Sequence, residues 1–325
     1  MSVSRRLETE LEHLKQLRKD PGSPELKLEL ERSLEKGAAL LVASAATICL
    51  ELQLTALEPR LLQSWERFRD KPASNDKGCR ARTALARALV HFDCSCEELY
   101  LEGIHLRQPE AVWGGTEDTA AELRAVCAGG LAQTAYTDVA IELAELLADP
   151  EAEARLGAVR ALAQLDAWRA EPLLRYKLLS GDEDPQVLGE CCLVLLRLSP
   201  QGALQFVSRF LAVDDRRIAE ASALALGESH LENAFRPLHQ AWEQVLDEEF
   251  RRTLLLAMAM LRTEPALEFL LEIAATETLP VAEQAVSALA LCRHDDRLYL
   301  ALQDIGAARD DDLATIVERE FLRDK

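Results

Sequence analysis

The stretch "DPEAEARLGAVRALAQL", residues 149–165, carries the signals of a complete helix. Asp149 favours the position just before a helix, and Pro150 suits a first helical turn, where its missing N–H would have lacked a partner anyway. Alanine and leucine then follow at helical spacing. A second stretch, "DPQVLGECCLVLLRL" at 184–198, repeats the same order of signals. The sequence therefore predicts a series of units, of which residues 149–165 are one helix.

The leucine- and alanine-rich helix recurs through the second half of the chain. Its equivalent positions lie 29 to 34 residues apart and are Leu162, Leu195, Leu224, Met258 and Leu289. A period of this length is typical of stacked helical pairs. Between these helices, prolines are expected to open the partner helices, because proline suits a first helical turn. These prolines are Pro172, Pro200, Pro237 and Pro265.

The composition agrees with a helical interior. The chain of 325 residues is 49% hydrophobic but only 5% aromatic. An interior built mainly from leucine, alanine and valine favours closely packed helices over a β-sandwich. Alanines on the first helix of each unit would let the neighbouring unit approach closely. The net charge of −19 repels phosphate backbones and argues against sequence-independent binding of nucleic acid.

The amino-terminal stretch and the cysteines both indicate a reducing compartment. Residues 1–20 alternate charged residues with leucine and lack the unbroken apolar core of a secretory signal. The most apolar stretch, Gly37 to Leu50, is shorter than the roughly 20 residues that a spanning helix needs. Among eight cysteines, Cys191 and Cys192 are adjacent within an apolar helical pattern, which is typical of reduced core thiols. We expect a cytoplasmic protein without a membrane segment.

Two polar stretches interrupt the series. Residues 69–78, "RDKPASNDKG", are rich in turn formers and indicate a junction. We therefore expect an N-terminal helical cap region over residues 1–70 and a repeat solenoid with a C-terminal capping helix over residues 79–325. Residues 103–118, "GIHLRQPEAVWGGTED", form a longer connection than a repeat turn needs and hold Trp113. Loops of this kind often carry function.

The units share a pattern of aspartate, two or three residues, a branched apolar residue, arginine and then an alanine-rich helix. It is clearest in "DDRRIAEASALALGES" at 214–229 and "DEEFRRTLLLAMAML" at 247–261. This pattern resembles the HEAT-repeat family, especially the short-repeat subgroup known from phycobilisome lyases, over about residues 116–305. The resemblance implies an all-α fold: a right-handed α-solenoid of stacked antiparallel helix pairs. It also implies that the arginine braces neighbouring repeats, although Leu188 and Glu283 replace it in two units.

The residues that could carry metal chemistry do not form a recognised pattern. Cys79, His91, Cys94 and Cys96 are the nearest candidates for a zinc site. Cys94 and Cys96 are separated by one residue, whereas structural zinc loops separate their cysteines by two to four, and no second knuckle follows. The acidic runs "GDEDP" and "RDDDL" lack the spacing of a calcium loop and are interpreted as solvated helix ends. We predict no metal and no cofactor.

No catalytic signature is visible either. The histidines of the repeats are scattered, and no serine or cysteine lies in a recognisable nucleophile motif. The stretch "WGGTED" lacks the spacing and the lysine of a phosphate-binding loop. We interpret Thr116 as a cap of the following helix, with Glu117 and Asp118 at its positive end. We predict no catalytic residues.

The remaining candidates are surface side chains. We expect the second helix of each pair to line a concave groove, and arginine and aromatic residues to act there as anchors for a protein partner. The predicted partner-binding residues of the groove are Arg175, Tyr176, Arg209, Arg236, His239 and Trp242. Phe206 and Phe235 lie on the same helices and are expected in the core. Trp113, in the 103–118 connection, is the alternative anchor.

Three functions follow. The first is a non-catalytic scaffold or adaptor that binds another protein through the groove or the Trp113 connection. The second, implied only by the short-repeat resemblance, is a lyase or chaperone for phycobilin attachment, which would hold a tetrapyrrole in the groove. The third is a DNA-repair glycosylase of the HEAT-like kind, which needs a strongly basic channel that a chain of net charge −19 would have to gather on one face.

Overall fold

The computed structural model describes residues 3–69 and 72–321 and divides the chain into two compact units. Unit 1 is Met1–Leu165 and unit 2 is Asp166–Lys325. The elements of unit 1 are α1 (Val3–Leu17), α2 (Pro24–Lys36), α3 (Ala39–Glu51), η1 (Thr55–Leu57), α4 (Glu58–Arg69), α5 (Pro72–Asn75), η2 (Lys77–Cys79), α6 (Arg80–His91), α7 (Glu97–His105), β1 (Pro109–Val112), β2 (Gly115–Asp118), α8 (Ala121–Gln133), α9 (Val139–Leu146) and α10 (Ala152–Leu162).

Unit 2 continues the series with helices alone in its described part. Its elements are α11 (Ala167–Ser180), α12 (Pro185–Leu198), α13 (Pro200–Ser208), η3 (Arg209–Ala212), α14 (Arg216–Glu228), η4 (Glu232–Ala234), α15 (Phe235–Gln244), α16 (Glu248–Leu261), α17 (Glu264–Thr276), α18 (Leu279–Leu289), η5 (Ala290–Cys292), α19 (Asp296–Ala308) and α20 (Leu313–Phe321). The predicted all-α solenoid of helix pairs is confirmed, with one short hairpin as its exception. No helix within the described residues is both long and apolar enough to cross a membrane.

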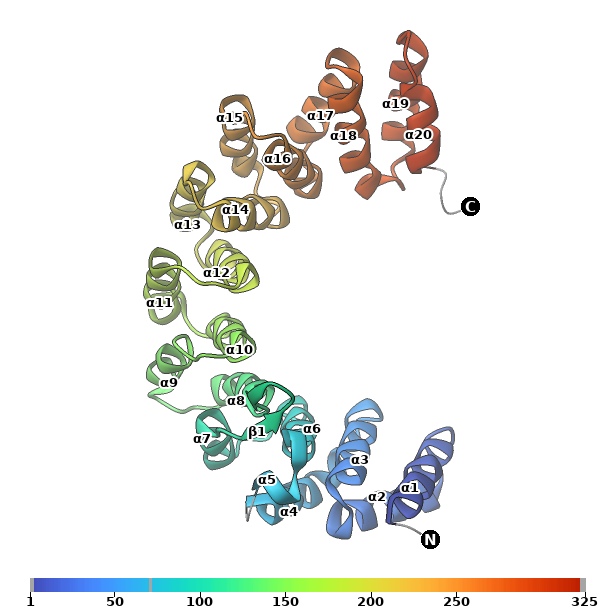
Figure 1. Ribbon diagram of the computed structural model, residues 1–325, viewed down its shortest axis with the longest axis vertical. Coiled ribbons are helices and arrows are strands. Elements are labelled where there is room, and N and C mark those ends of the chain that lie inside the picture. Colours follow the sequence, from blue (N-terminus) through green and yellow to red (C-terminus); the bar gives the residue numbers. More distant parts are fainter. Residues whose placement is uncertain (1–2, 70–71, 322–325) are drawn as a thin grey trace. The chain divides into compact units, whose positions relative to one another are not determined.

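Each unit packs its helices in two rows (Figure 1). In unit 1, the row α3, α6, α8 and α10 runs side by side, with α4, α7 and α9 packed against it. In unit 2, the corresponding row is α12, α14, α16, α18 and α20, with α11, α13, α15, α17 and α19 outside it. Each helix therefore buries its apolar face against its own partner and the next pair, as the period predicts.

The stretch 149–165 forms α10, but its first residues behave differently from the prediction. The helix begins at Ala152, after both Asp149 and Pro150. Asp149 is buried, and its carboxylate accepts the N–H of Glu151 at 2.9 Å rather than an amide of the helix itself. In the sister stretch the prediction is confirmed, because Asp184 accepts the N–H of the second residue of α12 at 2.8 Å. The burial of Asp149 is explained below by an arginine partner.

The predicted position in a first helical turn is confirmed for three of the prolines and wrong for the fourth. Pro200 and Pro265 stand in the first turn of α13 and α17. Pro237 is the third residue of α15, still in its first turn. Pro172, by contrast, lies inside α11, which begins five residues earlier at Ala167. Its predicted place at a helix start is wrong, because the helix continues through it despite the lost backbone hydrogen bond.

Small residues allow the close approach of neighbouring helices. A Cβ added to Gly227 on α14 would lie 2.4 Å from the backbone oxygen of Ala257 on α16. In unit 1, a Cβ on Gly157 of α10 would lie 2.3 Å from the Cα of Ala125 on α8. The backbones are therefore in direct contact, and only glycine fits at these two crossings.

The predicted boundary at residues 70–79 stays a prediction. Residues 70 and 71 lie outside the described part of the chain, and the two compact units meet in sequence at residues 165 and 166 instead. The eight cysteines form no disulfide, and Cys191 and Cys192 are buried, as expected of core thiols.

Candidate functional site

The connection between α7 and α8 contains a β-hairpin, the only strand pair in the described residues (Figure 1). β1 and β2 pair antiparallel, with Pro109 opposite Asp118 and Val112 opposite Gly115. Two residues, Trp113 and Gly114, make the turn. Gly114 has a φ of 95°, which glycine adopts at little cost and which allows so tight a turn.

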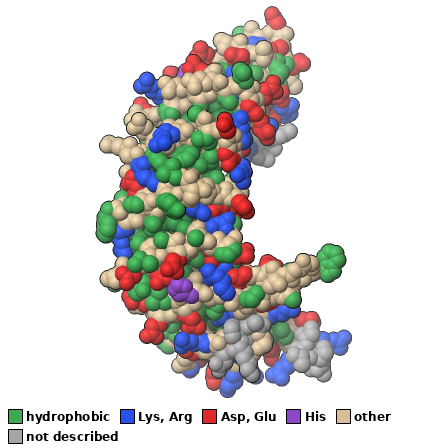
Figure 2. All heavy atoms as spheres, turned by 60° about the vertical axis from the view of Figure 1, so that its left-hand side comes forward, with side chains coloured by type: hydrophobic (Ala, Val, Ile, Leu, Met, Phe, Trp, Pro, Cys, Tyr) green, Lys and Arg blue, Asp and Glu red, His purple; other side chains and the backbone are tan. Residues whose placement is uncertain are grey.

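The tip of the hairpin carries Trp113, whose side chain is fully exposed at 103%. Val112 beside it is 43% exposed, and a Cβ added to Gly114 or Gly115 would meet nothing within 4 Å. The hairpin stands out from the body as a narrow arm with a hydrophobic end (Figure 2). An indole so far from any core contributes little to folding and is available to a partner.

The base of β1 is tied down through Glu110. Its Oε1 accepts hydrogen bonds from the backbone N–H of Gly78 at 2.7 Å, from Nε2 of Gln108 at 2.6 Å and from Oγ1 of Thr119 at 3.1 Å. These donors come from η2, from the residue before β1 and from the residue after β2. One carboxylate thus holds both ends of the hairpin to the turn that precedes α6.

Behind Glu110 lies a buried pair, Asp76 and Arg82. Asp76 accepts the backbone N–H groups of Ala81 and Arg82 at 2.8 and 3.0 Å and pairs with Nε of Arg82 at 3.1 Å. Arg82 also donates to the side-chain oxygen of Gln108, and Gln108 donates to the backbone oxygen of Asp76 at 2.8 Å. All three side chains are at least 98% buried, so the hairpin entry is fixed by hydrogen bonds inside the protein.

The base of β2 is tied down through Asp118 and Arg124. Asp118 accepts the N–H of Gln108 at 2.9 Å and pairs with Arg124 at 2.7 Å. The fully buried Arg124 also pairs with Asp149 at 2.9 Å, and Arg107 approaches the other oxygen of Asp149 at 2.7 Å. Two arginines therefore face two carboxylates, which is how a protein keeps buried charges.

These contacts also correct the interpretation of Thr116. It lies in β2 opposite Ala111, not at a helix start. The residue that serves the start of α8 is Asp118, whose Oδ1 accepts the N–H of Ala120 at 3.1 Å.

The contacts at the base of the hairpin stabilise the ionised forms of the Glu110 and Asp118 carboxyl groups. Hydrogen bonds from Gly78, Gln108 and Thr119 hold the pKa of Glu110 below its ordinary value. Burial alone would raise the pKa of Asp118, but the amides of Gln108 and Ala120 and the guanidinium of Arg124 outweigh it and lower that pKa. Both carboxylates are therefore charged at neutral pH and hold their donors.

Of the predicted groove residues, Arg209 lines a pocket of about 460 Å³ together with Pro237 and Gln240 of α15. Within unit 2, Figure 1 shows α12, α14 and α16 in one row and α11, α13 and α15 in the other. The predicted anchors belong to α11, η3 and α15. They therefore lie in the row that packs against the alanine-rich helices α12, α14 and α16, and their role in binding a partner stays a prediction.

The six groove residues differ in exposure. Tyr176 is 73% exposed, and Arg209 and Arg236 are also exposed. Arg175 is half-buried, pairs with Glu171 at 2.7 Å and lies over the ring of the buried Phe206. Three of these side chains are therefore exposed to solvent, whereas Arg175 packs against neighbouring side chains of the protein.

Trp242 and His239 are largely part of the packing. Trp242 is buried and meets Phe269 edge to face at 5.4 Å, while Arg251 covers its ring. His239 is half-buried and meets the same phenylalanine at 4.5 Å. The predicted role of Trp242 as a surface anchor is wrong. Phe206 is buried as predicted, whereas Phe235 is only half-buried.

The cysteine–histidine cluster weighed from the sequence is not assembled. Among the described residues, the group with metal-ligand geometry is His105, Glu142 and Glu145, and none of Cys79, His91, Cys94 and Cys96 belongs to it. Cys79 is buried, and burial raises the pKa of its thiol to about 11, so it is not a thiolate at neutral pH.

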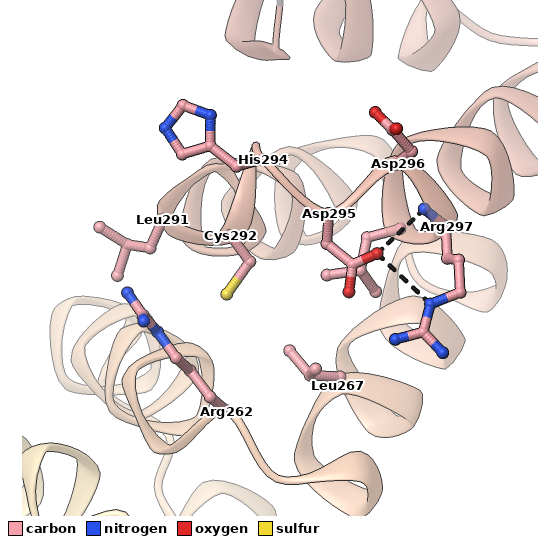
Figure 3. A pocket seen from close by; sticks show the side chains of 9 residues that line it. Arg262, Leu267, Leu291, Cys292, His294, Asp295, Asp296 and Arg297 are labelled. Carbon is pink, nitrogen blue, oxygen red and sulfur yellow. Dashed lines mark hydrogen bonds and ion pairs between the residues drawn. The ribbon is translucent and has the colours of Figure 1, made fainter.

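A pocket of about 650 Å³ lies in unit 2 between the ends of α16, α17 and α19 (Figure 3). Arg262, Cys292 and His294 are on its wall. Burial raises the pKa of the Cys292 thiol more than Arg262 lowers it, so the thiol stays protonated. Asp295 accepts the N–H of Arg297 at 3.0 Å and starts α19. The pocket therefore holds no activated nucleophile.

Sequence reasoning missed the buried charges beneath the hairpin. A signal for them exists, because Arg82 and Arg124 each occupy an apolar helical stripe. Arg124 follows Ala120 by four residues and precedes Cys127 by three, and both of these neighbours are buried. An arginine at such a position must find an acidic partner inside the fold.

Comparison with known families identifies the repeats. A family model of HEAT repeats matches residues 141–227, from α9 to the end of α14. The chain therefore contains HEAT repeats over this stretch. The match is to HEAT repeats in general and does not assign the short-repeat subgroup. Arg217, at the start of α14, donates to the backbone oxygen of Glu183 at 3.3 Å, in the turn before α12.

Three solved structures are similar over most of the chain. An engineered protein has 14% identity and a TM-score of 0.37, with 98% of this chain and 95% of that one covered. Human deoxyhypusine hydroxylase in complex with glycerol has 18% identity and a TM-score of 0.31, with 79% and 98% covered. A chain of the Pds5–Scc1 complex has 13% identity and a TM-score of 0.38, with 90% and 61% covered. Likenesses this loose carry no argument about function. Comparison with curated proteins gave no match.

Proposed function

We propose that this HEAT-repeat protein is a non-catalytic adaptor that binds a partner protein through the Trp113 hairpin. The observation that carries the proposal is the contrast between tip and base. The tip exposes a whole indole side chain, and the base is fixed by buried hydrogen bonds and ion pairs. Tryptophan is among the residues most enriched in binding hot spots, because its burial against a partner removes a large apolar area from water.

Preorganisation adds to this argument. A flexible loop loses conformational entropy when it binds, whereas an arm already held in place loses less. Glu110 and Asp118 hold the two strands at their base, and Trp113 is separated from this base by only a few residues of paired strand. The arm is therefore suited to insert one aromatic side chain into a pocket of the partner.

The test is affinity capture with the full-length tagged chain from its native cells, comparing the unchanged protein with W113A and W168A. Trp168 on α11 is also exposed, at 76%, and serves as the matched control. The proposal expects a reproducible partner that W113A loses and W168A keeps. A photo-reactive residue at position 113 should crosslink to the same partner.

Two outcomes would overturn the proposal. If no protein is reproducibly captured, the adaptor role fails. If W113A captures the partner as well as the unchanged chain does, the hairpin is not the binding surface. The double variant R209A/R236A then tests the exposed arginines of η3 and α15. Trp242 is left unchanged in this variant, because it is buried and its removal would disturb the core.

A further inference from the structure

A second constellation lies beside the hairpin entry and is independent of Trp113. His105 is the last residue of α7, and Glu142 and Glu145 are one turn apart on α9. One imidazole nitrogen and one oxygen from each carboxylate lie within 4.8 Å of one another. The donor atoms of a tetrahedral zinc centre are about 3.3 Å apart, so modest side-chain movement would close this group around one ion.

The contact between His105 and Glu142 is close but is not aligned as a hydrogen bond. Nε2 of His105 lies 2.8 Å from Oε2 of Glu142, yet this buried oxygen has no partner with hydrogen-bond geometry among the described residues. An imidazole nitrogen and a carboxylate oxygen at this distance need a positive centre between them, either a proton or a metal ion. The proton requires alignment of the N–H with the oxygen, whereas a metal ion accepts both atoms from the side.

The charges around the group favour a dication over a proton. Within the described residues, no lysine or arginine forms an ion pair with Glu142 or Glu145. Two carboxylates beside one imidazole therefore form a group whose negative charge a dication would balance.

We propose that His105, Glu142 and Glu145 bind one divalent transition-metal ion, such as Zn²⁺, with water completing the coordination. The imidazole selects transition metals over Ca²⁺ and Mg²⁺, which prefer six or more oxygen ligands. The ion links the end of α7 to α9, two outer helices of unit 1. His105 precedes Gln108 by three residues, so the bound ion also steadies the segment that enters the hairpin.

The test titrates the purified full-length chain with Co²⁺, whose visible absorption reports protein ligands, and with Zn²⁺ by calorimetry. The expected result is one equivalent bound. Loss of even an outer-shell partner costs about 10- to 100-fold in affinity, so H105A and E145Q should each lose at least about tenfold. Both positions are exposed, and circular dichroism checks that each variant remains folded.

The control is H239A. His239 also faces a glutamate, Glu243 at 3.9 Å, but belongs to no group of three potential ligands among the described residues. This variant should bind Co²⁺ as the unchanged protein does. The proposal is overturned if the unchanged chain binds no stoichiometric metal, or if E145Q binds as tightly as it, because His105 and Glu142 are then an ordinary ion pair. Neither result bears on the Trp113 hairpin, whose test is partner capture.

Discussion

The base of the hairpin and the inner row of unit 2 are both buried, but different forces hold them. In unit 2, α12, α14 and α16 meet through alanine and leucine, and Gly227 touches Ala257 directly. Beneath the hairpin, the buried side chains include Arg82 and Arg124 with their acidic partners. A repeat can rely on apolar packing because each pair has neighbours, whereas a lone two-stranded hairpin is marginal and needs directional contacts to hold it.

The largest effect is expected from a variant that disrupts the buried ion pairs at the base of the hairpin. Arg124→Met removes the guanidinium that faces Asp118 and Asp149 and leaves two buried carboxylates without it. Breaking a buried pair in this way typically costs about 3–5 kcal/mol of unfolding free energy. Urea denaturation measures the loss. Arg217→Ala, which removes an exposed pair with Asp215, is the control and should change the unfolding free energy far less, because solvent screens that pair. Equal losses would show that the base carries no special stability.

The second prediction tests the apolar row. Gly227→Ala forces α14 and α16 apart, because the new Cβ would lie 2.4 Å from a backbone oxygen. Overpacking of this kind costs about 1–3 kcal/mol. Gly189→Ala on α12 is the matched control, because its nearest neighbour would be at an ordinary 3.8 Å. That variant should gain up to about 1 kcal/mol from helix propensity. Thermal unfolding of both variants decides, and a neutral Gly227→Ala would mean that the row is loosely packed.

The third prediction uses pH to separate the two regions. The pKa values of Glu110 and Asp118 lie below their ordinary values of 4.5 and 3.8. Their contribution to stability is complete above those ordinary values and is lost as the pH falls through the lower values of the folded protein. Unfolding free energy should therefore decline below about pH 4.

The decline should be smaller in D118N than in E117Q, which alters an exposed carboxylate on the same strand. Chemical denaturation between neutral and acidic pH measures both. Identical pH profiles for the two variants would contradict a role for Asp118 in the acid response.

The smallest expected effect concerns the tip. Trp113→Ala should change the unfolding free energy by no more than about 0.5 kcal/mol, because the side chain is fully exposed. The same variant should abolish partner capture. A large loss of stability would show that Trp113 packs against the protein and would weaken its assignment as a binding anchor.

The repeats were predictable from particular residues. The spacing of leucine and alanine predicted the helices, and Asp184 with Pro185 predicted the start of α12. Local signals suffice here because a helix depends on neighbours three and four positions away. The same signals failed at Asp149, where a buried arginine captured the carboxylate, and at Pro172, where tertiary packing carried a helix past the proline.

The candidate site was predictable only in part. The length of the 103–118 connection and the presence of Trp113 marked it as a site, but not as a hairpin, since its strands are only four residues each. The binding role of the predicted groove residues stays a prediction, because repeat spacing does not say which side chains of a helix pair remain exposed. Trp242 was misjudged for a related reason: exposure of an aromatic residue depends on which helix covers it.

The amino-acid sequence by itself determined the helical repeats, their period and the likeness of residues 141–227 to HEAT repeats, because all three depend on residue spacing along the chain. The tertiary structure alone decided which charges are buried, how the hairpin is held and which side chains remain exposed at its tip. Those properties depend on contacts between residues far apart in sequence, such as Arg124 and Asp149, and no local pattern specifies such a pair.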